Sequence, residues 1–448
     1  MKKRVLGCVL GAAVAGLAAL SLASCDKAAS DVFHIYAWNT EFQGFFYKYV
    51  SDEKIGDLSK TVHLDGKEVK WTIVPSDNGA YQESLDKALE NNEKAKPQDK
   101  VDLFLAEADY ILKYTNSNVT KDVKKLSKNA INADDLANQY QYTVDAASDK
   151  NGVLKGVSFQ CCPAGVIYRR SIAEDLFGAS DPETVQSKIS DWTKFNAVAA
   201  QAKAKGYYMT ASFAETYRAF SNNVSSPWVD SNKNLQFDNQ INAWMDQAEL
   251  FVNNGYTLTA GIWDNECTAE MAKTGKAFCY FGPAWYYNFC MGPAQDEKTG
   301  CFGDWGLVEG PASYFWGGTW MLAANGGDDD ELVGKTMKAF TSDETVCRNL
   351  GFNESQFVNF KKVNEGISAY YNATDGGNKF LGGQNDTELY LEGAEKIQFK
   401  NITIYDQYCN EGLQNKFQEY LKGSVTKQEA LNNFKIYLQE KCPDVKVA

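Results

Sequence analysis

The chain has 448 residues, of which 44% are hydrophobic and 23% charged, so it is long enough for two or three globular domains and too apolar for a disordered protein. Acidic residues outnumber basic ones by 58 to 45, and the net charge of −13 disfavours nucleic-acid binding, which calls for a basic face. The two histidines, His34 and His63, both lie near the N-terminus. Hydrolases and zinc enzymes that depend on histidine are therefore a poor fit.

The first 24 residues have the pattern of a secretory signal, because three cations precede an uncharged apolar stretch that ends in small residues. The alternative is a single membrane-spanning anchor, since the stretch is near the lower length limit for a span. Residues 22–25, Leu-Ala-Ser-Cys, resemble a bacterial lipobox, in which cleavage leaves a lipid-modified cysteine. We therefore expect a signal peptide over 1–24, lipidation of Cys25 and a flexible tether over 25–31. The body would then lie on the extracytoplasmic face of the cell membrane and reach it only through the lipid anchor.

Apolar, β-branched segments alternate with helical ones along the body, which predicts an α/β fold with parallel strands. Predicted strands cover residues 32–38, 70–75, 101–105, 156–159, 165–168, 277–281, 304–308 and 317–323. Predicted helices cover residues 42–49, 80–94, 192–205, 240–253, 329–341, 414–421 and 427–439. Because two runs of this alternation follow one another, two α/β lobes are the expected architecture.

Nine cysteines follow the lipobox, and an odd number leaves at least one thiol unpaired. Cys290 and Cys301 flank a polar loop, and the sequence is equally compatible with a loop-closing disulfide and with two buried thiols. The chain has no CxxC pair and too few histidines for the usual zinc sets, so we expect no metal and no cofactor. The acidic run over 328–330 favours a helix N-terminus over a metal site, because acids there complement the helix dipole.

Aromatic and small polar residues gather directly after the predicted strands, where ligands bind in open α/β sheets. A flat ring suits the C–H face of a pyranose, while carboxylates and amides bind hydroxyl groups. Trp71, Trp192 and Trp244 fall on core patterns and are expected inside. The candidate ligand-binding residues are Trp38, Asn39, Glu41, Asn78, Glu107, Asp109, Tyr217, Trp228, Trp285, Tyr286, Trp316 and Trp320.

Three segments of the body also show a distinctive order and spacing. Residues 165–171 read Gly-Val-Ile-Tyr-Arg-Arg-Ser, residues 275–285 contain Gly-Lys-Ala and end in Gly-Pro-Ala-Trp, and residues 304–323 contain Gly-Gly-Thr-Trp. Together with the lipobox they resemble the extracellular solute-binding proteins of carbohydrate ABC transporters (family 1, the maltose-binding-like group). In that family the corresponding segments are a strand followed by YNKDL, a G.KAAM...GPW segment, and a crossover followed by a GG..W.I strand.

The resemblance implies a two-lobed periplasmic-binding-protein-like fold (type II), with crossing linkers and a ligand cleft between the lobes that closes on its ligand. The lobes are expected to comprise residues 32–155 plus 309–345, and 156–308 plus 346–448. The resemblance also implies that Trp285 or Tyr286 stacks on the sugar, because Ala284 is inserted after the family's Gly-Pro.

The expected function is that of a monomeric, lipid-anchored receptor without catalytic activity, which captures a sugar or oligosaccharide and delivers it to an ABC transporter permease. Two alternatives stay open. A polyamine or other cationic solute would suit an aromatic box with carboxylates such as Glu41, Asp77, Glu107 and Asp109. A cell-surface glycoside hydrolase would need two carboxylates, for which Asp109 and Glu215 are the candidates.

Overall fold

The strands form two separate sheets in the computed structural model, which describes residues 31–374 and 376–447. The predicted signal peptide and Cys25 lie outside the described residues. The first sheet has the order β2 (His63–Leu64), β3 (Lys67–Ile73), β1 (Val32–Ala37), β4 (Leu103–Glu107), β11 (Thr319–Ala323) and β5 (Gly156–Ser158). The second has the order β10 (Tyr314–Phe315), β6 (Pro163–Arg169), β8 (Ala277–Pro283) and β7 (Tyr208–Thr210), with β9 (Trp305–Val308) paired to β6.

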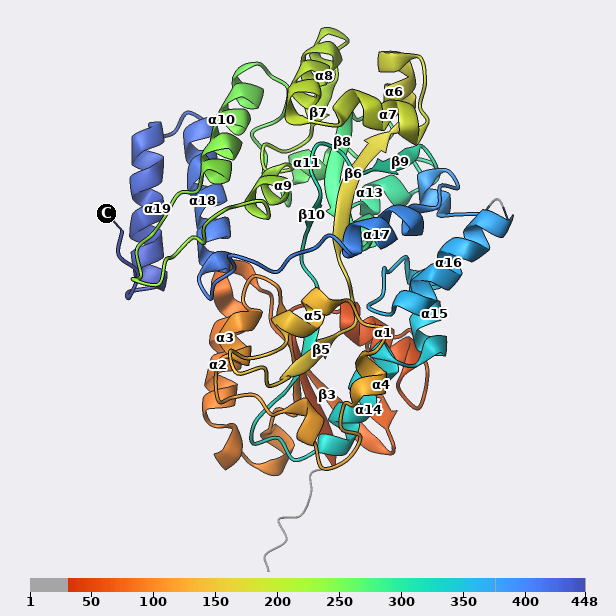
Figure 1. Ribbon diagram of the computed structural model, residues 1–448, viewed down its shortest axis with the longest axis vertical. Coiled ribbons are helices and arrows are strands. Elements are labelled where there is room, and N and C mark those ends of the chain that lie inside the picture. Colours follow the sequence, from red (N-terminus) through yellow and green to blue (C-terminus); the bar gives the residue numbers. More distant parts are fainter. Residues whose placement is uncertain (1–30, 375, 448) are drawn as a thin grey trace, which may run out of the picture.

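Each sheet forms the centre of one lobe, and the two lobes lie one above the other in Figure 1. The lower lobe carries α1 (Glu41–Tyr49), α2 (Ala80–Glu90), α3 (Ile111–Thr115), α4 (Ala133–Leu136), α5 (Gln141–Ala146) and α14 (Asp330–Thr341). The upper lobe carries α6 (Arg170–Phe177), α7 (Pro182–Ile189), α8 (Trp192–Ala204), α9 (Tyr217–Ser221), α10 (Asn239–Asn253), α11 (Asn265–Ala269), α12 (Ala284–Phe289), α13 (Gly292–Gln295), α17 (Asp386–Ala394), α18 (Asp406–Leu421) and α19 (Lys427–Lys441). Helices α15 (Glu344–Glu354) and α16 (Lys361–Thr374) lie at one side of the junction. Short 3-10 helices are η1 (Asp77–Gly79), η2 (Asn92–Lys94), η3 (Pro97–Asp99), η4 (Val123–Lys125) and η5 (Lys379–Leu381).

The prediction of parallel strands is correct for only part of each sheet. Strand β1 pairs in parallel with β3 and β4, and β7 pairs in parallel with β8. Strands β11 and β5 are antiparallel to their neighbours, and so are the pairs that β6 makes with β8, β9 and β10. The reason is topological, because a strand that enters a lobe from the other lobe must run away from the junction. Thr319, at the start of β11, therefore lies opposite Glu107, at the end of β4.

Two strands lie in a different lobe from the one that the predicted boundaries assign. Strand β5 pairs with β11 in the first sheet, so the chain first changes sheet between Ser158 and Pro163. Strand β10 pairs with β6 in the second sheet, so the chain returns between Phe315 and Thr319. The predicted boundaries at 156 and 309 fall before these points. Short strands that cross between lobes reveal their sheet only through their pairing partners, which no local pattern shows.

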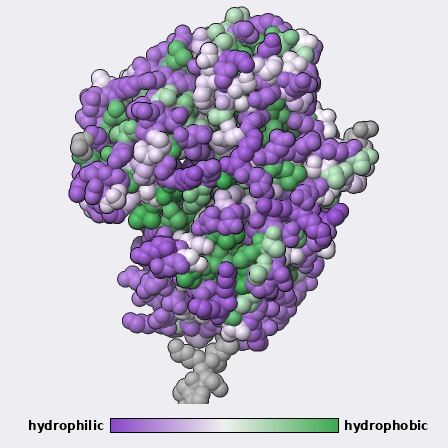
Figure 2. Space-filling model, viewed as in Figure 1, coloured by the Kyte–Doolittle hydropathy of each residue, from purple (hydrophilic) through white to green (hydrophobic). Residues whose placement is uncertain are grey.

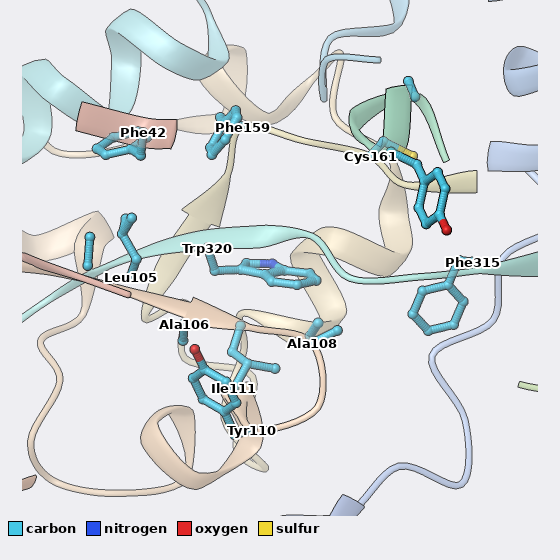
Figure 3. Packing of buried hydrophobic residues seen from close by; sticks show 14 of the residues in the cluster. Phe42, Leu105, Ala106, Ala108, Tyr110, Ile111, Phe159, Cys161, Phe315 and Trp320 are labelled. Carbon is cyan, nitrogen blue, oxygen red and sulfur yellow. The ribbon is translucent and has the colours of Figure 1, made fainter. Parts of the chain in front are cut away.

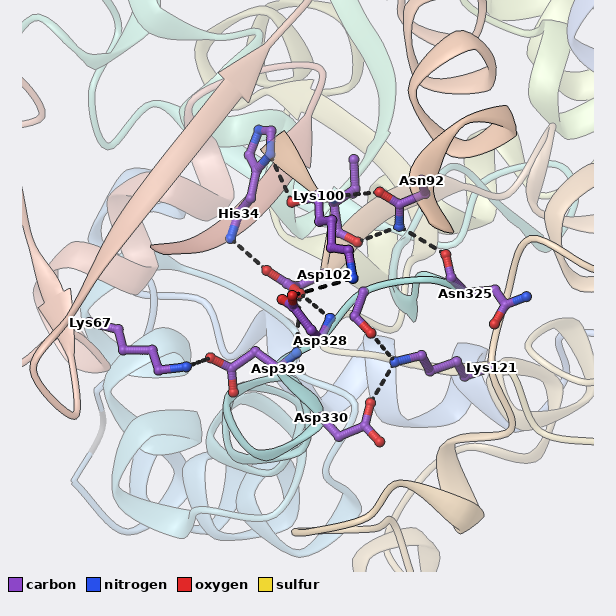
Figure 4. Close-up of polar contacts among 12 residues, drawn as sticks. His34, Lys67, Asn92, Lys100, Asp102, Lys121, Asn325, Asp328, Asp329 and Asp330 are labelled. Carbon is purple, nitrogen blue, oxygen red and sulfur yellow. Dashed lines mark hydrogen bonds and ion pairs between the residues drawn. The ribbon is translucent and has the colours of Figure 1, made fainter. Parts of the chain in front are cut away.

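The acidic run over 328–330 begins helix α14, as predicted. The side chain of Asp329 accepts a hydrogen bond from the backbone N–H of Leu332 and so caps the helix. Lys67 forms an ion pair with Asp329 (2.8 Å), and Lys121 forms one with Asp330 (2.6 Å). Figure 4 shows these pairs grouped around buried Asp102. The run is therefore part of the structural network of the first lobe.

Among the residues that the structure describes, none of the helices has the length and apolar character that a membrane span requires.

All nine cysteines of the described chain are buried and free, so Cys290 and Cys301 are thiols and the disulfide alternative is wrong. Burial raises the pKa of both thiols, which lowers their reactivity.

Candidate functional site

The carboxyl ends of β1 and β4 lie at the edge of the first sheet that faces the second lobe. Trp38, directly after β1, is half-buried and packs edge-on against Tyr81 and Tyr110, with ring centroids 5.7 Å and 6.3 Å away. Asn39 accepts a hydrogen bond from the backbone N–H of Glu41 (3.0 Å) and so shapes the turn into α1. Asn78 belongs to η1, and its side chain lies outside the described part of the chain.

Two predicted carboxylates at this edge have strongly raised pKa values. Burial raises the pKa of Glu41 to about 7, although Gln356 donates to its Oε1 (3.4 Å). Burial, with the adjacent charge of Asp109, raises the pKa of Glu107 to about 8. Both side chains are therefore substantially protonated near neutral pH, where each carboxyl group is able to donate a hydrogen bond as well as accept one.

Asp109 connects this edge to the other lobe. Its two carboxylate oxygens accept hydrogen bonds from Nη1 and Nη2 of Arg218, on α9, at 2.8 Å and 2.6 Å. The guanidinium carbon lies 5.7 Å from the ring centroid of Trp316, so the same arginine also contacts an aromatic ring. Arg218 was not among the predicted site residues. The signal that would have found it is its position next to Tyr217 in a chain with only five arginines.

Four rings of the second lobe and of the crossing segment form what we call the aromatic wall: Trp263, Trp285, Phe289 and Trp316. Trp285 and Trp316 have ring centroids 5.1 Å apart, and each also contacts a more exposed ring. Trp263 is 61% exposed and Phe289 50% exposed, and they pack edge-on against each other. Phe289 was missed, although its i, i+4 spacing from Trp285 on α12 places both rings on one helix face.

The aromatic wall and the carboxylates meet at Gly317. A Cβ atom at this position would lie 3.5 Å from Oε1 of Glu107 and 3.6 Å from the indole of Trp285. The φ angle of +75° also favours glycine there. Figure 2 shows hydrophobic residues gathering around the waist between the lobes on the face in view. The junction therefore combines flat apolar rings with polar groups that donate and accept hydrogen bonds.

Four predicted ligand-binding residues lie in the core instead. Trp320 is fully buried among the hydrophobic side chains that Figure 3 shows. Its indole N–H donates to the carbonyl of Thr143 (2.8 Å). Tyr217 and Trp228 are buried, and both donate to Oδ1 of Asn410. The fourth, Tyr286, is also fully buried. Of the two rings proposed to stack on the sugar, Tyr286 is therefore in the core and Trp285 is half-buried.

The glycine of the Gly-Pro-Ala-Trp segment, Gly282, lies against the ring of Tyr286. A Cβ atom at Gly282 would lie 2.4 Å from Cγ of buried Tyr286, so the glycine allows that ring to pack against the strand. We expect Gly282→Ala to destabilise the protein by about 1–3 kcal/mol through overpacking. The measurement is denaturant unfolding. Gly292→Ala is the control, because nothing lies within 4 Å of its Cβ position, and an equal loss in both variants would contradict the prediction.

The carboxyl pair proposed for a hydrolase is not placed for acid–base catalysis. Glu215 is only 2% exposed, and its Oε2 accepts a hydrogen bond from the backbone N–H of Phe281 (2.9 Å). Burial raises its pKa to about 8. Asp109 is occupied by Arg218 in a bidentate ion pair. Glu215 therefore acts as an internal acceptor of the second lobe.

A pocket lies beside the Asp109–Arg218 pair and encloses about 590 Å³ of space, part of it open to solvent. Both lobes line it, with Asp109 and Gly317 on one side and Trp228, Asp238 and Asn410 on the other. Within the described part of the chain, no group of three or more histidine, cysteine, aspartate or glutamate side chains is arranged to hold a metal ion.

A family model described as bacterial extracellular solute-binding protein matches residues 66–349, more than half of the chain. The chain belongs to this family. The resemblance found in the sequence is thus confirmed, and the binding protein is assigned to the extracytoplasmic side of the cell by its family. A search of curated sequences finds no match.

Solved structures match the binding protein over nearly its whole length. An extracellular solute-binding protein of family 1 has 15% identity over 91% of this chain and 99% of its own, with a TM-score of 0.68. The transporter-associated binding protein of B. animalis subsp. lactis, in complex with β-1,6-galactobiose, has 14% identity over 93% and 99%, with a TM-score of 0.64. The galacto-N-biose/lacto-N-biose I-binding protein of Bifidobacterium longum has 12% identity over 94% and 100%, with a TM-score of 0.66. At these identities the likeness establishes the two-lobed fold, which confirms the predicted fold class.

Proposed function

We propose that this binding protein captures a sugar or oligosaccharide between its lobes and delivers it to the permease of an ABC transporter, while lipidated Cys25 holds it at the membrane. The observation that carries the proposal is the aromatic wall beside Glu107 and the Asp109–Arg218 pair. Two structural neighbours were solved with galactobiose and lacto-N-biose, which supports the same class of ligand here.

The chemistry of the junction suits a polyhydroxylated ring. Exposed indole and phenyl faces bury the C–H face of a pyranose, and the energy comes from apolar area together with ring geometry. Protonated Glu41 and Glu107 are able to donate to hydroxyl oxygens, and the lone pairs of Asp109 that its pairing with Arg218 leaves are able to accept from hydroxyl groups. Contacts from both lobes stabilise the closed form, so binding and lobe closure are coupled.

The test is a titration of tryptophan fluorescence and of melting temperature against mono- and oligosaccharides, with spermidine and putrescine as competing ligand classes. Saturable binding of a sugar raises the melting temperature in proportion to the logarithm of its excess over Kd. Unchanged sugar after prolonged incubation would separate a receptor from a hydrolase. A response to polyamines alone would contradict the sugar proposal.

The anchor is tested separately with Cys25→Ser. We expect the variant to leave the membrane fraction, because no acyl chain then holds it there. The measurement is immunoblotting of membrane and soluble fractions. Equal membrane retention of wild type and variant would contradict the lipid anchor and favour a membrane-spanning segment.

A further inference from the structure

Two charged side chains, Asp109 and Arg218, join the lobes directly across their junction. Asp109 follows β4 in the first lobe, and Arg218 lies on α9 in the second. Their side chains are 13% and 16% exposed, and both guanidinium–carboxylate hydrogen bonds are short, at 2.8 Å and 2.6 Å. Because the two groups bond directly to each other, this connection needs no bridging solute.

Asn410, on α18, also contacts the Asp109 carboxylate. Its Oδ1 accepts from the hydroxyl of Tyr217 (2.6 Å) and from the indole N–H of Trp228 (2.9 Å). Both donors are buried, so the orientation of the amide is determined and its Nδ2 must point the other way. That Nδ2 donates to Oδ2 of Asp109 (3.3 Å), the same oxygen that accepts from Arg218.

Two further polar contacts between the lobes are weaker or more exposed than this pair. Nζ of Lys441 lies 3.5 Å from Oε1 of Glu83, whose side chain is 60% exposed. Exposed ion pairs of this kind contribute little to stability. Gln82 on α2 donates to Gln407 on α18, a neutral contact. A bidentate, largely buried arginine–carboxylate pair is stronger and more directional, and losing one partner leaves a buried charge unpaired. The Asp109–Arg218 pair is therefore the main polar connection that these contacts offer.

We propose that Asp109, Arg218 and Asn410 form an interlobe latch that populates the closed conformation before any solute binds, with Asn410 as its positioning residue. The latch acts on lobe closure. Its effect does not depend on which solute the protein binds. Its consequence for binding is quantitative, because apparent affinity scales with the fraction of molecules that are already binding-competent. A tenfold smaller closed fraction would weaken binding tenfold.

The experiment measures the radius of gyration of the purified protein, without added solute, by small-angle X-ray scattering. We expect the wild-type radius to match that of this structure, the closed form, in which Arg218 and Asp109 are paired across the junction. Arg218→Lys keeps the charge but loses the bidentate geometry, and we expect a larger radius. Asn410→Asp keeps the acceptor for Tyr217 and Trp228 but places a carboxylate against Asp109, so it should open the lobes as well.

Arg348→Lys is the matched control. Arg348 pairs with Glu344 (3.8 Å) and lies over the ring of Phe352, both on its own helix, so this change should leave the radius unchanged. Circular dichroism and thermal melting establish that each variant is folded. A wild-type radius larger than that of the closed structure would overturn the latch. The same conclusion would follow if folded Arg218→Lys and Asn410→Asp both kept the wild-type radius.

Discussion

Replacing Trp285 by alanine is expected to weaken sugar binding about tenfold or more. The half-buried indole contacts Trp316 at 5.1 Å between centroids and lies beside Glu107 at Gly317, so it stands where the aromatic wall and the carboxylates meet. Central aromatic side chains of this kind dominate binding energies, and a factor of ten corresponds to about 1.4 kcal/mol. The measurement is isothermal titration calorimetry with the sugar that the fluorescence panel identifies.

The control for this change is Tyr370→Ala. Tyr370 is a more exposed ring, at 54%, and it lies on α16, where it packs against Phe352 and Tyr371. Its removal should leave the affinity unchanged. If Trp285→Ala binds as tightly as wild type while remaining folded, the aromatic wall is not the sugar-binding surface and the proposed function loses its main support.

Replacing Glu215 by glutamine is expected to stabilise the protein at pH 8 and to flatten the dependence of its stability on pH. Burial raises the pKa of Glu215 from 4.5 to about 8. Between these values the unfolded chain has lost the proton that the folded protein keeps, so stability falls as pH rises from about 4.5 to 8. A shift of this size corresponds to about 4 to 5 kcal/mol over the full window. Glutamine keeps an acceptor for the N–H of Phe281 and removes this titration.

Melting temperatures measured from pH 4.5 to 8.5 test the prediction. Glu41, Glu107, Asp406 and Glu411 also have raised pKa values, so the wild-type profile sums several contributions and the variant removes one of them. Glu392→Gln, at an exposed position on α17, is the control. Parallel pH profiles for wild type and Glu215→Gln would show that Glu215 titrates normally.

Regular elements with strong periodicity were predicted closely. The helix predicted over residues 240–253 is α10, Asn239–Asn253, and its predicted inward face, including Ile241, Trp244 and Phe251, is buried. The helix predicted over 414–421 is only the second half of α18, which begins at Asp406. Its first half carries buried polar residues such as Asn410, whose partners lie in distant segments, so local hydrophobicity could not reveal it.

Among the tryptophans of the candidate site, too, local sequence predicted some positions well and others wrongly. Trp285 follows strand β8 and Trp316 follows strand β10, and both side chains are half-buried. Trp320 was predicted at the site from its place after the Gly-Gly turn, yet it is the second residue of a central strand and lies in the core. A position near a strand end does not specify the face on which a side chain lies, because register with neighbouring strands decides that.

The sequence by itself determined the α/β class, the family and the segments whose ends supply the site, because these depend on local periodicity and on short motifs in order. Only the tertiary structure decided which side chains meet. The bidentate contact of Asp109 with Arg218 joins residues 109 positions apart, and Asn410 reaches the same carboxylate across 301 positions. The aromatic wall joins α12, the loop that carries Trp263 and the crossing segment. Contacts of this length arise from the docking of two lobes, and docking depends on the complementarity of whole surfaces, which a local stretch of sequence does not encode.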